Sequence, residues 1–250
     1  MRRVICLNAD LGELPGPAGR SLDAAMLSVV TRCNVACGGH AGDEASMRAT
    51  VREAKAKAVE IGAHPSYPDV EHFGRRSLRM EPDDLAAAIE FQTRQLLLIA
   101  SEEGADVRHL KAHGALYNDA VKDADLARLI VRVAMDAGIA QIIGPPGSAL
   151  EAASGAAGCD FVAEGFADRT YEPDGSLTPR SIGGAVIENP ASVLAQALLI
   201  TAEGIVDVRG GGRIALPVRT LCLHSDTPGA PEHARNLRAG LEAAGIEVCA

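Results

Sequence analysis

Short apolar segments alternate with longer amphipathic segments along almost the whole chain, and this alternation restricts the fold more than any other feature. The short segments have the length and character of buried strands, and the longer ones have the apolar spacing of helices. The predicted strands span residues 4–9, 33–37, 61–64, 108–112, 140–145, 160–165 and 219–224. The predicted helices span residues 22–32, 43–60, 82–103, 119–137, 147–154, 190–203 and 229–245. Because parallel strands need a crossover connection, the pattern predicts an α/β fold with a parallel sheet.

About seven strand–helix units fit into the 250 residues. This number favours a single-domain TIM-like (β/α) barrel over residues 1–250, because such barrels commonly have this length. An open, doubly wound sheet is the alternative, but the Gly-rich dinucleotide fingerprint is missing after the first strand. Segments 204–208 and 213–218 flank a run of three glycines and predict a hairpin.

Composition and charge argue against several classes of protein. The formal net charge is −9 and no cluster of Lys or Arg forms a stripe, so we do not expect binding to nucleic acid. No apolar run approaches the roughly 20 residues of a membrane span, and residues 1–10 lack the apolar core of a signal peptide. The six cysteines include no C-x-x-C pair. We therefore expect a cytoplasmic protein that has no membrane span and no disulfides.

Polar side chains follow most of the predicted strands at the point where each strand ends. In a (β/α) barrel, these C-terminal ends and their loops form the active-site face. Five residues are therefore expected to meet in one cleft, namely Asp10, His40, His64, Lys111 and His113. Asn8 in the first strand and His224 at the end of the last one are expected near the same cleft. By contrast, His72, His109 and His233 are interpreted as structural or solvated.

Each of these residues also has a structural interpretation. Asp10 could cap the first turn of the chain, and the glycines around His40 could serve only as turn residues. Lys111 lies in an apolar strand pattern, where an ammonium needs an anionic partner. That partner could be a substrate, which would make Lys111 functional, or Asp10, which would make the pair structural. Arg75 could bind a carboxylate or only keep an exposed loop soluble.

Six motifs, taken together and in chain order, resemble one family. They are "LNADLGE", "ACGGHAGD", "GAHPSYPD", "KAHGALYN", "FADRTYEPDGSLTPRS" and "CLHSDTPGA", and they extend from Asn8 to about Ala230. The family is that of the 5-oxoprolinase A subunits, also called the LamB/YcsF family. The chain has CGGH where the family usually has CGFH, KAHG in place of KPHG, and LHSD in place of LHGD.

The resemblance implies a TIM-like barrel similar to the glycoside hydrolase and polysaccharide deacetylase barrels. It also implies the opening of 5-oxo-L-proline to L-glutamate, with ATP as co-substrate and with ADP and phosphate released. Family members act together with two further subunits, B and C. A lactam is a resonance-stabilised amide that water attacks slowly, so phosphorylation of its oxygen would create a leaving group. This chemistry needs cations, a group that exchanges protons near neutral pH, and a positioned water.

The resemblance and this chemistry assign candidate roles to the residues at the strand ends. Lys111 and Arg169 could stabilise negative charge, and His64 or His113 could act as general base, with Asp10 orienting that base. The similarity to deacetylases suggests a divalent metal held by Asp10, His40 and His64. The candidate substrate-binding residues are Asn8, His40, Arg75, Asp168, Arg169 and His224.

Two other kinds of function remain open at this point. The chain could be a stand-alone, metal-dependent deacetylase or amide hydrolase, which metal analysis and activity without ATP would reveal. It could instead be a non-catalytic regulatory subunit that only binds a ligand. Substitutions of Lys111 or His113 that abolish turnover but not binding would exclude that alternative.

Overall fold

The computed structural model describes residues 3–223 and 229–250. Within these residues, seven parallel strands form a closed barrel. They are β1 (Arg3–Leu11), β2 (Arg32–Ala36), β3 (Glu60–His64), β4 (Val107–Leu110), β5 (Gln141–Gly144), β6 (Asp160–Phe166) and β9 (Thr220–Leu223). Strand β1 pairs with β2 on one side and with β9 on the other, which closes the barrel. The predicted single-domain (β/α) barrel fold is confirmed.

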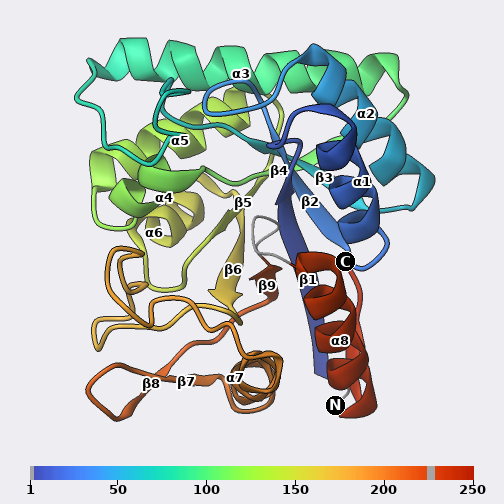
Figure 1. The fold of residues 1–250 in the computed structure, drawn as a ribbon. Coiled ribbons are helices and arrows are strands. Elements are labelled where there is room, and N and C mark those ends of the chain that lie inside the picture. The colour runs from blue at the N-terminus through green and yellow to red at the C-terminus, as the bar shows by residue number, and fades with distance from the viewer. Residues whose placement is uncertain (1–2, 224–228) are drawn as a thin grey trace.

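Eight helices among the described residues lie outside the strands, with α3 along the top of the view in Figure 1. They are α1 (Gly16–Leu27), α2 (Glu44–Ala56), α3 (Pro82–Glu102), α4 (Gly114–Ala120), α5 (Ala124–Asp136), α6 (Ala149–Ala157), α7 (Pro190–Glu203) and α8 (Ala230–Ala243). Local signals set several helix starts. Asp43 and Ser46 form a capping box at α2, and the Asp123 side chain accepts hydrogen bonds from the first turn of α5.

The two faces of β1 show how the barrel divides its apolar and polar side chains. Leu7 and Leu11 are fully buried in the hydrophobic core. Asn8 alternates with them and contacts polar side chains from β6 and β9. The interior of the barrel therefore contains a hydrogen-bonded polar network, where many such barrels have layers of aliphatic side chains.

Several predicted boundaries are wrong. The helix predicted at 22–32 begins at Gly16, because the Pro-rich segment before it forms the first turn, and it ends before β2. The helix predicted at 119–137 is two helices, and Asn118 lies inside the first of them. A short strand, β10 (Ile246–Val248), follows α8 and pairs with the start of β1. The predicted hairpin is confirmed as the antiparallel pair β7 (Ile205–Asp207) and β8 (Arg213–Ala215).

The long connection between β6 and α7 folds back over the barrel. Arg169 lies at its start, and the guanidinium donates hydrogen bonds to the carbonyl oxygens of Thr178 and Ala185. Isolated bridges join Arg169 to Val186 and Tyr171 to Leu177. Tyr171 and residues 173–180 line a pocket together with Asp10 and His64, so the connection borders the C-terminal ends of the strands. Within the described residues, no helix is both long and apolar enough to cross a membrane.

Candidate active site

Four side chains converge at the C-terminal ends of the first four strands and form what we call the Glu–His cluster. It consists of Glu13, His40, His64 and His113, with one nitrogen or oxygen atom of each lying within 4.8 Å of the others. His40 Nε2 is 2.9 Å from Glu13 Oε1, and His64 Nε2 is 3.0 Å from His113 Nδ1. Glu13 Oε1 is also 3.4 Å from His113 Nδ1.

Backbone carbonyl groups fix the orientation of two of the rings. His64 Nδ1 donates to the carbonyl oxygen of Lys111 at 2.8 Å, and His113 Nε2 donates to that of Phe73 at 3.0 Å. Because a carbonyl oxygen can only accept, these two nitrogens carry protons. The other nitrogen of each ring faces the cluster, where His64 Nε2 and His113 Nδ1 lie 3.0 Å apart and share one proton in a hydrogen bond. A metal that displaced this proton would meet a lone pair from each ring.

Tight packing holds the rings in place. The rings of His40 and His113 are stacked at 3.6 Å, and Phe73 makes edge contacts with both. Gly74 follows with φ of +61°, and a Cβ atom there would lie 2.9 Å from His40 Cβ. Only glycine combines this backbone conformation with so close an approach.

Burial and charge divide the titratable groups of the site into two kinds. Burial, helped by the charge of His64, lowers the pKa of His40 and of His113 to about 3, so both are neutral at pH 7. Burial alone would lower the pKa of His64, but the Asp10 carboxylate raises it above its ordinary value. Burial would likewise raise the pKa of Asp10, yet His64 and Lys111 hold it well below its ordinary value.

The Glu–His cluster fits a divalent cation. Metal–nitrogen bonds of 2.0–2.1 Å in a tetrahedral site separate neighbouring ligand atoms by roughly 3.4 Å. Four separations between ligand atoms of the cluster run from 2.9 Å to 4.0 Å, the longest joining His64 Nε2 and Glu13 Oε1. Three imidazoles and one carboxylate suit zinc and other borderline metals. Asp10 lies outside the cluster, with Oδ2 3.4 Å from His64 Nε2.

Lys111 is the centre of a second group of polar side chains, the Lys111 network. Its Nζ lies 3.1 Å from Asp10 Oδ1, 2.9 Å from Glu164 Oε1 and 3.1 Å from Cys222 Sγ. Asn8 Oδ1 is a fourth neighbour at 3.4 Å, so acceptors are available for all three protons of the ammonium. Burial would lower the pKa of Lys111, but Asp10 and the other anionic partners raise it well above its ordinary value.

Amide side chains complete the Lys111 network. Asn8 Nδ2 donates to Glu164 Oε1 and to Thr220 Oγ1, both at 2.9 Å. Asn34 Nδ2 donates to Asn8 Oδ1 and to Asp10 Oδ1, both at 2.8 Å. Asn8, a predicted substrate-binding residue, is therefore fully buried and holds the interior of the barrel together.

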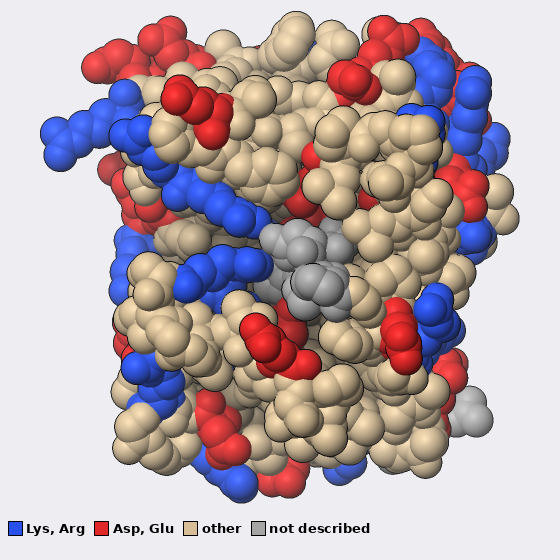
Figure 2. Space-filling model, in the orientation of Figure 1, with Lys and Arg blue, Asp and Glu red and all other residues tan. Residues whose placement is uncertain are grey.

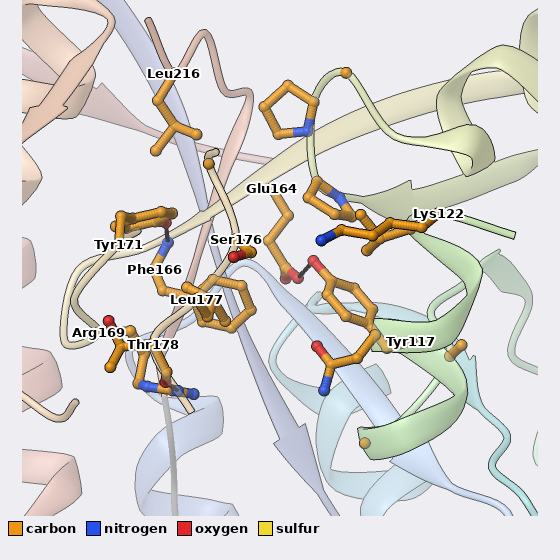
Figure 3. A pocket seen from close by; sticks show the side chains of 18 of the residues that line it. Tyr117, Lys122, Glu164, Phe166, Arg169, Tyr171, Ser176, Leu177, Thr178 and Leu216 are labelled. Atoms are coloured by element: carbon orange, nitrogen blue, oxygen red, sulfur yellow. Dashed lines mark hydrogen bonds between the residues drawn. The ribbon is translucent and has the colours of Figure 1, made fainter. Parts of the chain in front are cut away.

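A pocket of about 1060 Å³ opens over both groups. Asp10, Glu13 and His64 line its inner part, and Figure 3 shows other walls formed by Tyr117 and Glu164 on one side and by Tyr171, Leu177 and Leu216 on the other. The basic residues among its lining are Arg75, Lys111, Lys122, Arg169 and Arg180. Figure 2 shows Lys and Arg side chains that reach toward the middle of this face. The lining also includes the acidic residues Asp10, Glu13, Glu151, Glu164 and Asp174, so it carries charges of both signs.

The structure brings together the five residues predicted to meet, namely Asp10, His40, His64, Lys111 and His113. Arg75 also lines the pocket, with its guanidinium carbon 5.0 Å from the centre of the Phe73 ring. Arg169 lines it too, but two of its donors hold the β6–α7 connection. Asp168 is not among the lining residues, and His224 lies outside the described residues.

Sequence reasoning missed several residues of the site. Glu13 belongs to the motif "LNADLGE" but was not selected, although a carboxylate three residues after Asp10 is a plausible neighbour. Glu164 is a charged residue within an apolar strand pattern, which is the same signal that identified Lys111. No comparable signal marked Phe73.

Comparisons with known proteins identify relatives along the whole length of the chain. The sequence profile of the LamB/YcsF family matches residues 5–250. A protein of Methylococcus capsulatus, named as the A subunit of 5-oxoprolinase, is 48% identical, and the alignment covers 100% of this chain and 96% of that protein. A relative of the same name from Symbiobacterium thermophilum is 43% identical over 98% of this chain and 95% of its own length.

Solved structures extend the comparison. The crystal structure of a lactam utilization protein from Thermus thermophilus superposes with a TM-score of 0.89 at 38% identity and covers 99% of each chain. A structure described as T48 deacetylase with substrate has a TM-score of 0.51 at 15% identity, with 99% of this chain and 87% of that chain covered. This more distant likeness concerns the fold alone. On the strength of the profile match and the full-length relatives, the chain belongs to the LamB/YcsF family.

Proposed function

We propose that this chain is the A subunit of an ATP-dependent 5-oxoprolinase that acts together with the B and C subunits. The reaction opens the lactam of 5-oxo-L-proline to L-glutamate, and ATP is hydrolysed to ADP and phosphate. The observation that carries the proposal is the Glu–His cluster beside a pocket lined by charged residues, in a chain whose full-length relatives are named as 5-oxoprolinase A subunits. The name of the Thermus relative, a lactam utilization protein, supports the same substrate class.

The proposal includes a divalent metal held by Glu13, His40, His64 and His113. A bound metal of this kind would polarise a carbonyl oxygen or lower the pKa of a water molecule. The fit rests on the ligand separations and on the two backbone carbonyls that direct lone pairs of His64 and His113 toward the cluster. Glu13 and His113 thus join His40 and His64, which the sequence suggested as ligands, and Asp10 is assigned a different role.

Asp10 is the proton acceptor in this proposal. Once the imidazoles serve as ligands, Asp10 is the carboxylate beside the cluster that faces the pocket. Lys111 and Asn34 hold it ionised and in position through Oδ1, which leaves Oδ2 directed toward His64. ATP first phosphorylates the lactam oxygen and releases ADP. A water oxygen then bonds to the lactam carbon, and Asp10 takes the water's proton and passes it to the ring nitrogen as the C–N bond breaks. A second water releases phosphate from the acyl phosphate that remains, which gives glutamate.

Arg75 is the proposed partner of the substrate carboxylate. It is exposed, lines the pocket and is positioned through Phe73, which also packs against the cluster. A guanidinium suits a carboxylate because its paired donors match the two oxygens. Lys111 does not take this role in the proposal, since its three protons already serve Asp10, Glu164 and Cys222.

The test is to mix the purified chain with the B and C subunits, ATP and 5-oxoproline, and to measure glutamate. We expect glutamate only when this chain and both other subunits are present, and much less when the chain carries Asp10→Asn. A useful control is Asp106→Asn, which changes an exposed carboxylate far from the pocket lining. Full glutamate production by the B and C subunits without this chain would contradict the proposal.

The Glu–His cluster also favours a second candidate, a stand-alone metal-dependent amide hydrolase or deacetylase. Such an enzyme would need the metal but neither ATP nor partner subunits. Metal analysis of the purified chain, followed by assays on lactams and acetylated sugars without ATP, separates the two candidates. Turnover without ATP that depends on the bound metal would favour the second one.

A further inference from the structure

The hydroxyl of Tyr117 is held in one orientation at the wall of the pocket. Tyr117 and Glu164 both line the pocket, although the two residues are only 6% and 1% exposed. Tyr117 Oη lies 2.9 Å from Glu164 Oε2, and Figure 3 shows this bond as a dashed line between the two side chains. Within the Lys111 network, Asp10 and Lys111 also line the pocket.

Other members of the Lys111 network fix the direction of this hydrogen bond. Glu164 Oε1 accepts from Asn8 Nδ2 and from Lys111 Nζ, each at 2.9 Å, so Glu164 is a carboxylate that only accepts. Tyr117 must then be the donor to Oε2. Burial and the charge of Glu164 raise the pKa of Tyr117 well above its ordinary value, which keeps the phenol protonated. With its single proton bound to Glu164, the hydroxyl can offer only lone pairs to a ligand.

We infer that Tyr117 accepts a hydrogen bond from the ring N–H of the substrate and thereby selects lactams with a free N–H. The inference rests on the proposed function, because it assumes that the ligand is a lactam. Contacts lead from Tyr117 through Glu164, Lys111 and Asp10 to His64, and these five residues line the same pocket. In a lactam, the carbonyl and the N–H belong to adjacent ring atoms, which can face the Glu–His cluster and Tyr117 at once.

This arrangement predicts discrimination between ligands of nearly the same shape. The lactone analogue of 5-oxoproline has a ring oxygen in place of the N–H, and it would direct a lone pair at the lone pairs of Tyr117. The N-methyl lactam lacks the donor as well and adds bulk. A buried acceptor left without its donor weakens binding by about tenfold to a hundredfold.

The test is to measure the dissociation constants of 5-oxoproline, its N-methyl derivative and its lactone analogue by calorimetry. The full chain is used, both alone and assembled with the B and C subunits. We expect the wild-type chain to bind the lactam at least about tenfold more tightly than the lactone. Tyr117→Phe should bring the two constants close together. The matched control is Tyr67→Phe, because Tyr67 donates to the Asp119 carboxylate at 3.0 Å and neither residue lines the pocket.

A second variant, Glu164→Gln, tests the direction of the bond. The oxygen of Gln can keep the bonds from Asn8 and Lys111, and its amide nitrogen then donates to Tyr117. The proton of the hydroxyl is released toward the pocket, so the preference should shift toward the lactone. This result is independent of whether Tyr117→Phe folds.

The outcomes separate this inference from the proposed function. Equal binding of lactam and lactone by the wild-type chain overturns the inference and leaves the proposed function intact. A lactam preference that persists in both Tyr117→Phe and Glu164→Gln also overturns it. If 5-oxoproline binds neither the chain nor the complex, the proposed function fails and the inference fails with it.

Discussion

The Glu–His cluster and the Lys111 network lie side by side in the barrel, yet they differ in whether their hydrogen-bond donors and acceptors are paired with one another. In the Lys111 network, each proton of the ammonium meets an acceptor, and the two asparagine side chains link the acceptors to one another. In the Glu–His cluster, one carboxylate oxygen and three ring nitrogens face a common centre, and two of the rings use their other nitrogen on the backbone. The ammonium of the first group is already matched by anionic partners, whereas the second group is suited to receive a cation.

The largest expected effect comes from removing a ligand of the cluster. His113→Ala should abolish stoichiometric binding of a divalent metal and lower glutamate formation by the complex on the order of a hundredfold to a thousandfold. His72→Ala is the control, because His72 is partly exposed and bonds to Asp69 and Arg76 outside the cluster. Elemental analysis and the glutamate assay provide the measurements. A His113→Ala protein that keeps full metal content would remove the distinction between the two groups.

The next largest effect concerns the Lys111 network. Lys111→Met replaces the buried ammonium by an apolar chain and leaves Asp10 and Glu164 without their shared cation, so the free energy of unfolding should fall by about 3–5 kcal/mol. Arg108→Ala removes an ion pair whose partners are 63% and 76% exposed, and it should change stability by less than about 1 kcal/mol.

Urea denaturation of both variants measures the difference, and metal binding by folded Lys111→Met should remain close to that of the wild type. A stable Lys111→Met chain that has lost only activity would mean that Lys111 acts directly on the substrate. In that case the two groups would share one function.

The sequence predicted the barrel because apolar strands and amphipathic helices repeat with a regular period. It also placed Asp10, His40, His64, Lys111 and His113 at strand ends, and strand ends of a parallel barrel meet at one face. That rule depends only on topology, which explains why the convergence of these residues was predictable.

The division of these residues into two groups was not predictable from the sequence. Lys111 and His113 are two positions apart, yet the lysine enters the barrel and the histidine joins the cluster, since β4 ends at Leu110 and α4 begins at Gly114. The partners of Lys111 include Glu164, Cys222 and Asp10, which come from distant strands. Only the closed barrel brings these residues together. Spacing along the chain therefore could not reveal which acceptors would bind the protons of the Lys111 ammonium.

A smaller effect is expected where the backbone supports the cluster. Gly74→Ala adds a Cβ that would lie 2.9 Å from His40 Cβ and 3.0 Å from His113 Cδ2, at a φ of +61°. Gly138 has a similar φ of +81°, and an added Cβ would meet no atom within 4 Å. Gly138→Ala should therefore lower the free energy of unfolding by about 1–2 kcal/mol through backbone strain alone.

Gly74→Ala should lower the free energy of unfolding by about 1–3 kcal/mol more than Gly138→Ala does, because the rings of His40 and His113 must shift. It should weaken metal binding as well. Thermal unfolding and metal titration of both variants give the comparison. Equal losses of stability, with unchanged metal affinity, would show that the cluster tolerates displacement of its rings.

The smallest effect contrasts two carboxyl groups near the cluster, of which Asp10 is half-buried and Asp23 is buried. Asp10 has Lys111 and His64 beside it, and they hold its pKa well below the ordinary value. The side chain of Asp23 accepts from the Gly12 N–H at 3.0 Å and lies 3.5 Å from the Thr50 hydroxyl, and burial raises its pKa to about 6. A carboxyl whose folded-state pKa exceeds its unfolded value of about 3.9 binds more protons in the folded state between these two values.

Stability should therefore fall as the pH rises from about 4 to about 6, and the full loss should remain at higher pH. Asp23→Asn keeps an acceptor for the Gly12 N–H but cannot ionise. Its free energy of unfolding at pH 7 should therefore exceed that of the wild type by about 1–2 kcal/mol. The advantage should vanish below pH 4, because the wild-type carboxyl is then protonated in both states. Urea denaturation at several pH values measures this difference. An advantage that is the same at pH 4 and pH 7 would mean that packing, and not the charge of Asp23, separates this carboxyl from Asp10.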